Sequence, residues 1–180
     1  MNTIGIVGAG TMGGGIAYVA AASGFEVILH DVSGDMLERA LVRITADFRK
    51  GVEKQKLTDE QATSALSRIR ASSGFNDFSR CDCVIEAAIE RLDVKHDIFT
   101  RLESVCPPEA ILATNTSSLS VTAIGSPLKH PGRVVGMHFF NPAHLMKLVE
   151  VIGGHMTSMD TLKRAAELEV SSAEAQNTLG

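Results

Sequence analysis

The chain has 180 residues, of which 44% are hydrophobic and 21% are charged. This length and composition are typical of one soluble domain that buries its own core. The formal net charge of −4 and the absence of tryptophan argue against a nucleic-acid-binding protein, which presents a basic surface. No apolar run approaches the ~20 residues that cross a bilayer, and no leader pattern opens the chain, so we expect no membrane contact.

Residues 1–31 carry the strongest local signal. The apolar residues 4–7 predict a strand, and they lead directly into Gly8-Ala9-Gly10-Thr11-Met12-Gly13. A second predicted strand at residues 27–29 ends beside Asp31, about twenty residues after the glycines, as in dinucleotide-binding proteins. Glycines of this spacing also occur in ordinary turns, but the strand before them and the acid after them favour dinucleotide binding.

Each position in this fingerprint has a physical role. Gly8 permits the tight turn out of the strand, Gly10 lets a pyrophosphate approach the backbone, and Gly13 lets the following helix pack closely. The free amides at the helix N-terminus then face the phosphates. Asp31 would accept hydrogen bonds from a ribose and repel a 2′-phosphate, which favours NAD over NADP. Alternatively, Asp31 simply precedes the next helix.

Strands and helices alternate along the rest of the chain. Strands are predicted at residues 83–88, 111–113, 134–137 and 148–152, and helices at 11–23, 34–54, 58–69, 92–106, 121–124 and from about 159. Residues 72–79 are turn-like. This alternation predicts an α/β fold, with a doubly wound, mostly parallel sheet in a single domain over residues 1–180. Lys54, at the end of the long second helix, could reach an anionic substrate or could simply be solvated.

The cysteines give a hint of compartment. Cys81, Cys83 and Cys106 are an odd number in a chain without a leader pattern, which predicts reduced thiols and a cytoplasmic protein. Cys81 and Cys83 have the spacing of a metal pair. Because they lead into an apolar strand, we interpret them as core thiols.

Polar residues gather where the predicted strands end, which is where parallel sheets bind ligands. They are Glu90, Asn115, Ser117, His138 and Asn141. Glu150 lies within an otherwise apolar strand, where a carboxylate is costly unless it is paired. His138 is the natural partner, and a carboxylate beside an imidazole favours a general base that removes an alcohol proton.

These residues also have simpler explanations. His138 could be a core histidine, and Glu150 could face solvent on an edge strand. Ser117 could cap the following helix, and Asn141 before Pro142 could be a turn former. From the residues alone, we interpret the chain as an NAD-dependent oxidoreductase of unknown substrate.

Several motifs together resemble one family. They are the glycine fingerprint, Glu86-Ala87-Ala88-Ile89-Glu90-Arg91-Leu92-Asp93-Val94-Lys95, Asn115-Thr116-Ser117-Ser118-Leu119-Ser120, His138-Phe139-Phe140-Asn141-Pro142 and Met146-Lys147-Leu148-Val149-Glu150-Val151. Over residues 3–165 the chain resembles the N-terminal, NAD-binding domain of the L-3-hydroxyacyl-CoA dehydrogenases, including 3-hydroxybutyryl-CoA dehydrogenase. The resemblance implies oxidation of the 3-hydroxyl of an acyl-CoA by NAD, as in fatty-acid β-oxidation and butanoate metabolism.

The resemblance also implies residue roles. His138 matches the catalytic base, Glu150 the acid that orients it, and Ser117 and Asn141 residues near the substrate and the nicotinamide. Cofactor contacts are implied for a larger set, Gly8, Gly10, Thr11, Met12, Gly13, Asp31, Glu90, Lys95, Ser117 and Asn141. Ser117 and Lys54 match the region that holds the acyl-CoA.

The family pattern continues beyond this sequence. Its members carry a second, helical domain that closes the cleft and usually forms a dimer, whereas here residues 169–180 form an atypical tail with little apolar periodicity. A dehydrogenase must exclude water around hydride transfer, so we expect these 180 residues to bind NAD and to turn over acyl-CoA poorly unless another chain supplies the missing wall. The alternative is a non-catalytic NAD-binding module.

Overall fold

The computed structural model describes residues 1–143, 146 and 148–178, with the backbone alone for 169–178. Its strands form a seven-stranded sheet: β1 (Thr3–Val7), β2 (Glu26–His30), β3 (Ile69–Ser72), β4 (Cys83–Glu86), β5 (Ile111–Thr114), β6 (Val134–Phe139) and β7 (Val149–Gly153). The helices are α1 (Thr11–Ala22), α2 (Gly34–Glu53), α3 (Asp59–Ser67), α4 (Leu92–Val105), α5 (Val121–Gly125) and α6 (Met159–Thr178), with 3₁₀ turns η1 (Phe75–Arg80) and η2 (Pro131–Arg133).

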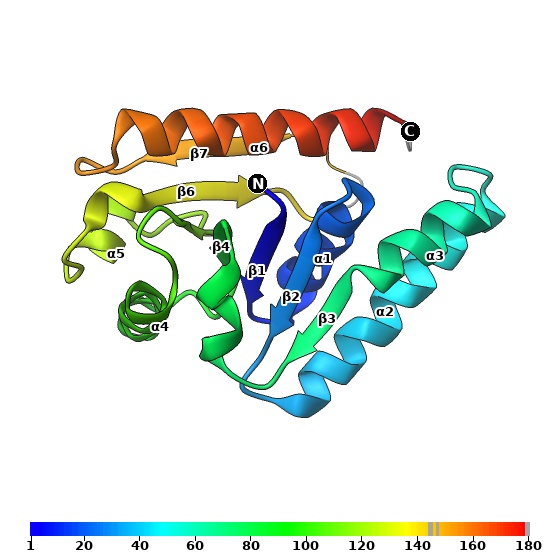
Figure 1. Cartoon of the computed structure of the whole chain (residues 1–180), viewed down its shortest axis with the longest axis horizontal. Coiled ribbons are helices and arrows are strands. Elements are labelled where there is room, and N and C mark those ends of the chain that lie inside the picture. The colour runs from blue at the N-terminus through cyan, green and yellow to red at the C-terminus, as the bar shows by residue number, and fades with distance from the viewer. Residues whose placement is uncertain (144–145, 147, 179–180) are drawn as a thin grey trace.

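The sheet has the order β3-β2-β1-β4-β5-β6-β7 (Figure 1). Pairings from β3 to β6 are parallel, and β7 runs antiparallel to β6. The predicted doubly wound α/β fold is therefore confirmed. The chain winds outward in one direction from β1 to β3 and in the other from β4 onward, so the order reverses between β1 and β4. That reversal is where ligands bind in such sheets.

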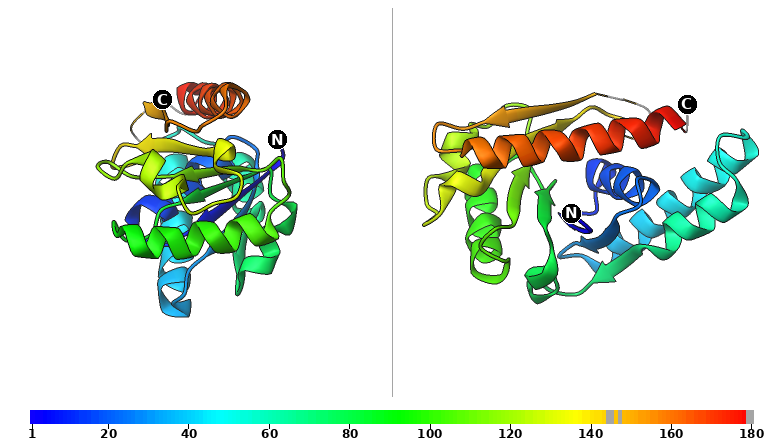
Figure 2. Two further views of the ribbon diagram at one scale, coloured as in Figure 1. Left: turned by 90° about the vertical axis from the view of Figure 1, so that its left-hand side faces the viewer. Right: turned by 45° about the horizontal axis from the view of Figure 1, so that its top comes forward.

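Two apolar clusters cover the two faces of the sheet, because successive side chains of a strand point to opposite sides. One contains Ile6, Leu29 and Ile85 from the strands, packed against α1, α2, α3 and α6. The other contains Val84 and Leu112, packed against α4, α5 and η1. Figures 1 and 2 show these two helical layers, with α6 lying along β6 and β7.

The structure differs from the predictions made from the sequence at two places. Residues 69–72, predicted as a helix end followed by a turn, form the edge strand β3 instead. The preceding helix begins with a capping box of Thr58 and Gln61 and ends at Ser67, two residues before the predicted end. The tail from residue 169 continues α6 as helix up to Thr178.

The three cysteines are buried and unpaired, as the sequence predicts. Burial raises the pKa of Cys81 to about 12 and that of Cys106 to about 11. The described residues contain no cluster of His, Cys, Asp and Glu suited to a metal ion. Cys81 and Cys83 are therefore core thiols, as interpreted from the sequence.

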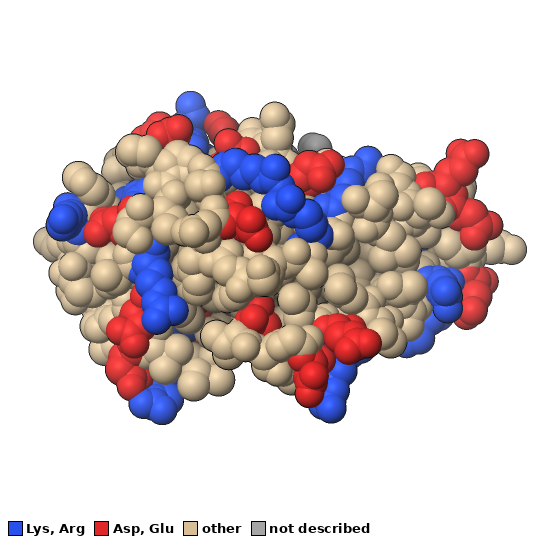
Figure 3. All heavy atoms as spheres, turned by 60° about the horizontal axis from the view of Figure 1, so that its bottom comes forward, with Lys and Arg blue, Asp and Glu red and all other residues tan. Residues whose placement is uncertain are grey.

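The surface of the described residues carries charges of both signs. On the face in Figure 3, Lys and Arg side chains are interspersed with Asp and Glu, without a broad field of one sign. None of the helices in the described part of the chain has the length and apolar character needed to cross a membrane.

Candidate functional site

A cleft of about 740 Å³ opens at the carboxyl ends of β1, β2 and β4, at the point where the strand order reverses. The glycine loop after β1 forms one wall, Asp31 and Ser33 after β2 form the second, and Ala87 and Ala88 after β4 form the third. Two backbone hydrogen bonds join these strand ends. The Gly8 amide donates to the His30 oxygen, and the Ala87 amide donates to the Val7 oxygen. The sequence fingerprint therefore lines one continuous cavity.

The three fingerprint glycines meet different constraints. Gly8 has φ +103°, and a Cβ there would lie 2.6 Å from the Ala87 oxygen. A Cβ at Gly13 would lie only 1.8 Å from the Gly8 oxygen. At Gly10, in contrast, a Cβ would meet no protein atom within 4 Å. Protein packing thus explains glycine at positions 8 and 13, whereas the open space at Gly10 fits a bound pyrophosphate.

The first turn of α1 is free to receive an anion. Gly10 is its N-cap, no side chain caps it, and no acidic residue lies in its first turn. Thr11 and Met12 line the cleft beside these amides. Helix N-termini of this kind attract phosphates through their unpaired N–H groups.

Asp31 does more than line the cleft. Its Oδ2 accepts the amide of Ala9 at 2.7 Å, and its Oδ1 accepts the amide of Ser33 at 2.9 Å. Asp31 therefore fixes the glycine loop and also precedes α2, which Ser33 caps through Met36. Each carboxylate oxygen keeps a lone pair for a ribose hydroxyl, and that contact stays a prediction.

His138 and Glu150 meet across the only antiparallel pairing among the described strands. They lie opposite each other in the β6–β7 register, and His138 Nδ1 is 2.9 Å from Glu150 Oε2. The side chains are 21% and 49% exposed. The predicted pair is confirmed, and Glu150 also faces solvent on an edge strand, so both interpretations of that residue hold. The pair lies at the carboxyl-terminal ends of the parallel strands, as the cleft does.

The loop after β5 leads toward this pair. Asn115 Oδ1 accepts the amide of Phe139 at 3.0 Å, which joins the ends of β5 and β6. Ser117 is exposed. The residue that caps α5 is Ser120, so the alternative role of Ser117 as the cap is wrong. Asn141 is exposed and lies two residues after the end of β6.

The sequence analysis did not predict a buried network of ion pairs and hydrogen bonds at the ends of β4 and β5. Glu86 and Lys95 are both 0% exposed, with Lys95 Nζ at 2.6 and 2.8 Å from the two Glu86 oxygens. Glu86 also accepts the Thr114 hydroxyl and the Ala88 amide. Lys95 is buried in the structure, and the cofactor contact that the resemblance implies for it stays a prediction. Lys95 also contacts the more exposed Glu90.

Glu90 connects this buried network to the loop after β5. Its carboxylate lies 3.3 Å from Lys95 Nζ and accepts hydrogen bonds from the hydroxyls of Thr116 and Ser118. Partial burial would raise the pKa of Glu90, but the Thr116 bond and the Lys95 ammonium outweigh it and lower the pKa. Glu90 is thus an anion that holds the loop carrying Ser117.

Lys54 is not brought to the cleft. It is the exposed C-cap of α2, whose other end begins beside Asp31. Because α2 has 20 residues, the two ends are about 30 Å apart. Lys54 does not line the cleft, and the contact with an acyl-CoA that the resemblance implies for it stays a prediction.

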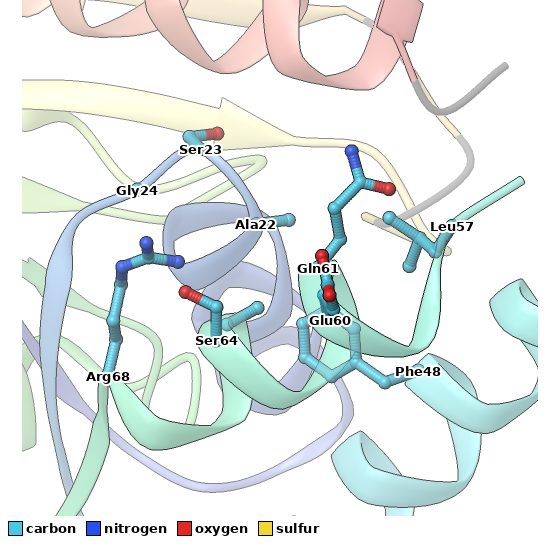
Figure 4. Close-up of a pocket in the computed structure, with 10 residues that line it drawn as sticks. Ala22, Ser23, Gly24, Phe48, Leu57, Glu60, Gln61, Ser64 and Arg68 are labelled. Carbon is cyan, nitrogen blue, oxygen red and sulfur yellow. The ribbon is translucent and has the colours of Figure 1, made fainter.

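A second pocket, of about 450 Å³, lies at the opposite end of α1 (Figure 4). Its lining includes Phe48 and Leu57, with Ser64 and Arg68 from α3 and the turn after it. The 12 residues of α1 separate it from the glycine loop by about 18 Å. It is therefore distinct from the cofactor cleft, and no residue singled out in the sequence lines it.

Comparison with known proteins identifies the family. Residues 3–173 match the family described as "3-hydroxyacyl-CoA dehydrogenase, NAD binding domain". The chain belongs to this 3-hydroxyacyl-CoA dehydrogenase family. The match extends beyond residue 165, where the resemblance in the sequence motifs ends. The cleft is accordingly that of an NAD-binding domain.

Relatives in the 3-hydroxyacyl-CoA dehydrogenase family are similar in sequence and in structure. The 3-hydroxyadipyl-CoA dehydrogenase of Escherichia coli (strain K12) is 46% identical, covering 95% of this chain and 36% of that protein. A 3-hydroxybutyryl-CoA dehydrogenase of Bradyrhizobium diazoefficiens is 45% identical, covering 93% and 57%. The crystal structure of (S)-3-hydroxybutyryl-CoA dehydrogenase from Ralstonia eutropha superposes with a TM-score of 0.94 at 38% identity, covering 96% and 61%. The chain thus spans less than two thirds of each relative.

The buried ion pair gives a stability test. Lys95→Met leaves the Glu86 carboxylate buried without its charge partner, so we expect a loss of about 3–5 kcal/mol in the free energy of unfolding by urea. Adding Glu86→Gln removes the orphaned charge and should recover much of that loss. Lys163→Met, at an exposed position of α6, serves as the control and should change stability by less than about 0.5 kcal/mol. A double variant as unstable as Lys95→Met alone would contradict the pairing.

The glycines give a test that separates packing from binding. Gly10→Ala should leave stability nearly unchanged, because its φ is −65° and its Cβ enters open space. We expect it to weaken NADH binding at least about tenfold, since the methyl group occupies the position of the pyrophosphate. Gly13→Ala should instead destabilise the fold by about 1–3 kcal/mol through overpacking. Fluorescence titration with NADH and urea unfolding measure the two effects, and unchanged NADH affinity in Gly10→Ala would be the contrary result.

Proposed function

We propose that the chain catalyses, or forms the catalytic NAD-binding half of an enzyme that catalyses, oxidation of the 3-hydroxyl of an L-3-hydroxyacyl-CoA to the 3-oxo group. The observation that carries the proposal is the 2.9 Å contact between His138 and Glu150 at the same sheet edge as the NAD cleft. The relatives named for 3-hydroxybutyryl-CoA and 3-hydroxyadipyl-CoA support an acyl-CoA substrate.

The dyad supplies the proton acceptor. With Nδ1–H donating to Glu150, the imidazole of His138 keeps a lone pair on Nε2 for the proton of the substrate hydroxyl. The Glu150 carboxylate then stabilises the imidazolium that forms, so the base need not move as it becomes charged. NAD, when bound, supplies the acceptor for the hydride that leaves C3.

Other residues after the strands are proposed to bind the cofactor and the substrate. Glu90 is proposed to contact the cofactor and to hold the loop that presents Ser117. Ser117, in the loop after β5, and Asn141, two residues after β6, are both exposed and are proposed to bind the substrate oxygen and the nicotinamide. Asp31 is proposed to bind the ribose, since its carboxylate would repel a 2′-phosphate.

The openness of the dyad motivates a second candidate. Glu150 is 49% exposed, whereas hydride transfer favours a site from which water is excluded. On this alternative, these 180 residues bind NAD without turning over acyl-CoA. The alternative and the main proposal share the cofactor cleft and differ in whether His138 has a catalytic role.

Replacement of His138 separates these candidates. We expect His138→Ala to bind NADH within about twofold of the unchanged chain while its reduction of acetoacetyl-CoA falls by about 10²-fold or more, the usual contribution of a general base. The exposed His155, just after β7, provides the control His155→Ala, which should change neither value.

The assay should compare the chain alone with a chimera that adds the remaining residues of the Bradyrhizobium relative. Turnover that depends on His138 in either form supports the dehydrogenase. Turnover that survives His138→Ala contradicts the assigned base. A chimera that binds NADH but has no turnover favours the non-catalytic module.

A further inference from the structure

Arg43 of α2 reaches back to the glycine loop. Its Nη2 donates hydrogen bonds to the carbonyl oxygens of Ala9 at 3.1 Å and Gly10 at 3.3 Å. The same Nη2 would lie 3.6 Å from a Cβ at Gly14, so the guanidinium covers the first turn of α1. Helices α1 and α2 pack side by side, which brings this side chain to the loop (Figures 1 and 2).

Ala9 is consequently held at both of its polar atoms. Asp31 accepts its N–H at 2.7 Å, and Arg43 donates to its C=O. These two residues come from the end of β2 and the middle of α2, so the loop is fixed from two elements. We name this arrangement the Asp31–Ala9–Arg43 clamp.

Peptide planarity turns this clamp into a statement about phosphate binding. In a trans peptide the C=O and the following N–H point in opposite directions. Because Arg43 holds the Ala9 oxygen, the amide of Gly10 is directed away from it. The Gly10 oxygen accepts both Arg43 and, at 2.9 Å, the amide of Gly14, so Arg43 and α1 together direct the amide of Thr11 the same way. Gly10 and Thr11 line the cleft, whereas Arg43 does not. The amides are therefore turned toward the side on which a pyrophosphate would lie.

We propose that Arg43 is a positioning residue for NAD, which acts by holding the Ala9 and Gly10 carbonyls so that the next two amides face the pyrophosphate. It acts through the backbone and does not itself touch the phosphates. The proposal rests on NAD binding and not on turnover, so loss of dehydrogenase activity in the unchanged chain would leave it standing.

The test compares ligands with and without a pyrophosphate. We expect Arg43→Met to weaken NADH and ADP-ribose binding by about five- to tenfold, less than the loss of one charged hydrogen bond, because the arginine acts only through the backbone. Adenosine, which lacks phosphates, should bind with unchanged affinity. NADH is followed by its fluorescence, and the other two ligands by displacement of NADH.

Two controls distinguish the proposal from simpler effects. Arg39→Met removes an exposed arginine one turn earlier on α2 and should leave all three affinities unchanged. The loss in Arg43→Met should persist in 1 M salt, where the Debye length is only ~3 Å and direct attraction between charges is screened.

Three results would overturn the role of Arg43. Unchanged NADH affinity in Arg43→Met would show that the loop keeps its shape without the clamp. A parallel loss for adenosine would show a general disturbance of the cleft. A loss that disappears in 1 M salt would show that the arginine attracts the phosphates by charge.

Discussion

The contact between Gly13 and the carbonyl of Gly8 is the constraint on which the rest of the site depends. A Cβ at Gly13 would lie 1.8 Å from the Gly8 oxygen, so α1 can begin this soon after β1 only if residue 13 is glycine. This close start points the uncapped N-terminus of α1 into the cleft between β1 and β4. The binding of an anionic cofactor there follows from backbone geometry, with Asp31 and Arg43 holding the loop in that shape.

The chemistry depends on a second geometric feature, the reversal of the chain after β6. A parallel seventh strand would carry its residues in the same direction as β6, whereas the antiparallel β7 places Glu150 directly opposite His138. The base and its carboxylate are thereby held by two neighbouring strands, and their side chains meet directly. The Asn115 bond to the Phe139 amide then ties this pair to the loop after β5.

Much of the fold and the site could be predicted because the signals were local. The fingerprint lies within residues 1–31, and Glu150 in an otherwise apolar strand suggested His138 as its partner, although the structure leaves Glu150 half exposed. The same reasoning applies more strictly to Glu86, at the end of a buried strand, and it would have pointed to Lys95 nine residues later. The pairing of Lys95 with Glu86 was missed because a lysine on a helix is normally solvated. The edge strand β3 was missed because its four residues, Ile69–Ser72, are too few for their alternating polarity to be told apart from the end of the preceding helix.

The most direct measurement asks whether the dyad and the cleft act on one cofactor. An NMR titration of the ¹⁵N-labelled chain with ADP-ribose and then with NAD⁺ reports both ends separately, because only NAD⁺ carries a nicotinamide. We expect the amides of Gly10 and Thr11 to shift with both ligands, and the His138 ring resonances to shift with NAD⁺ alone. A His138 ring that responds to neither ligand while the loop amides shift would contradict the placement of the nicotinamide beside this base.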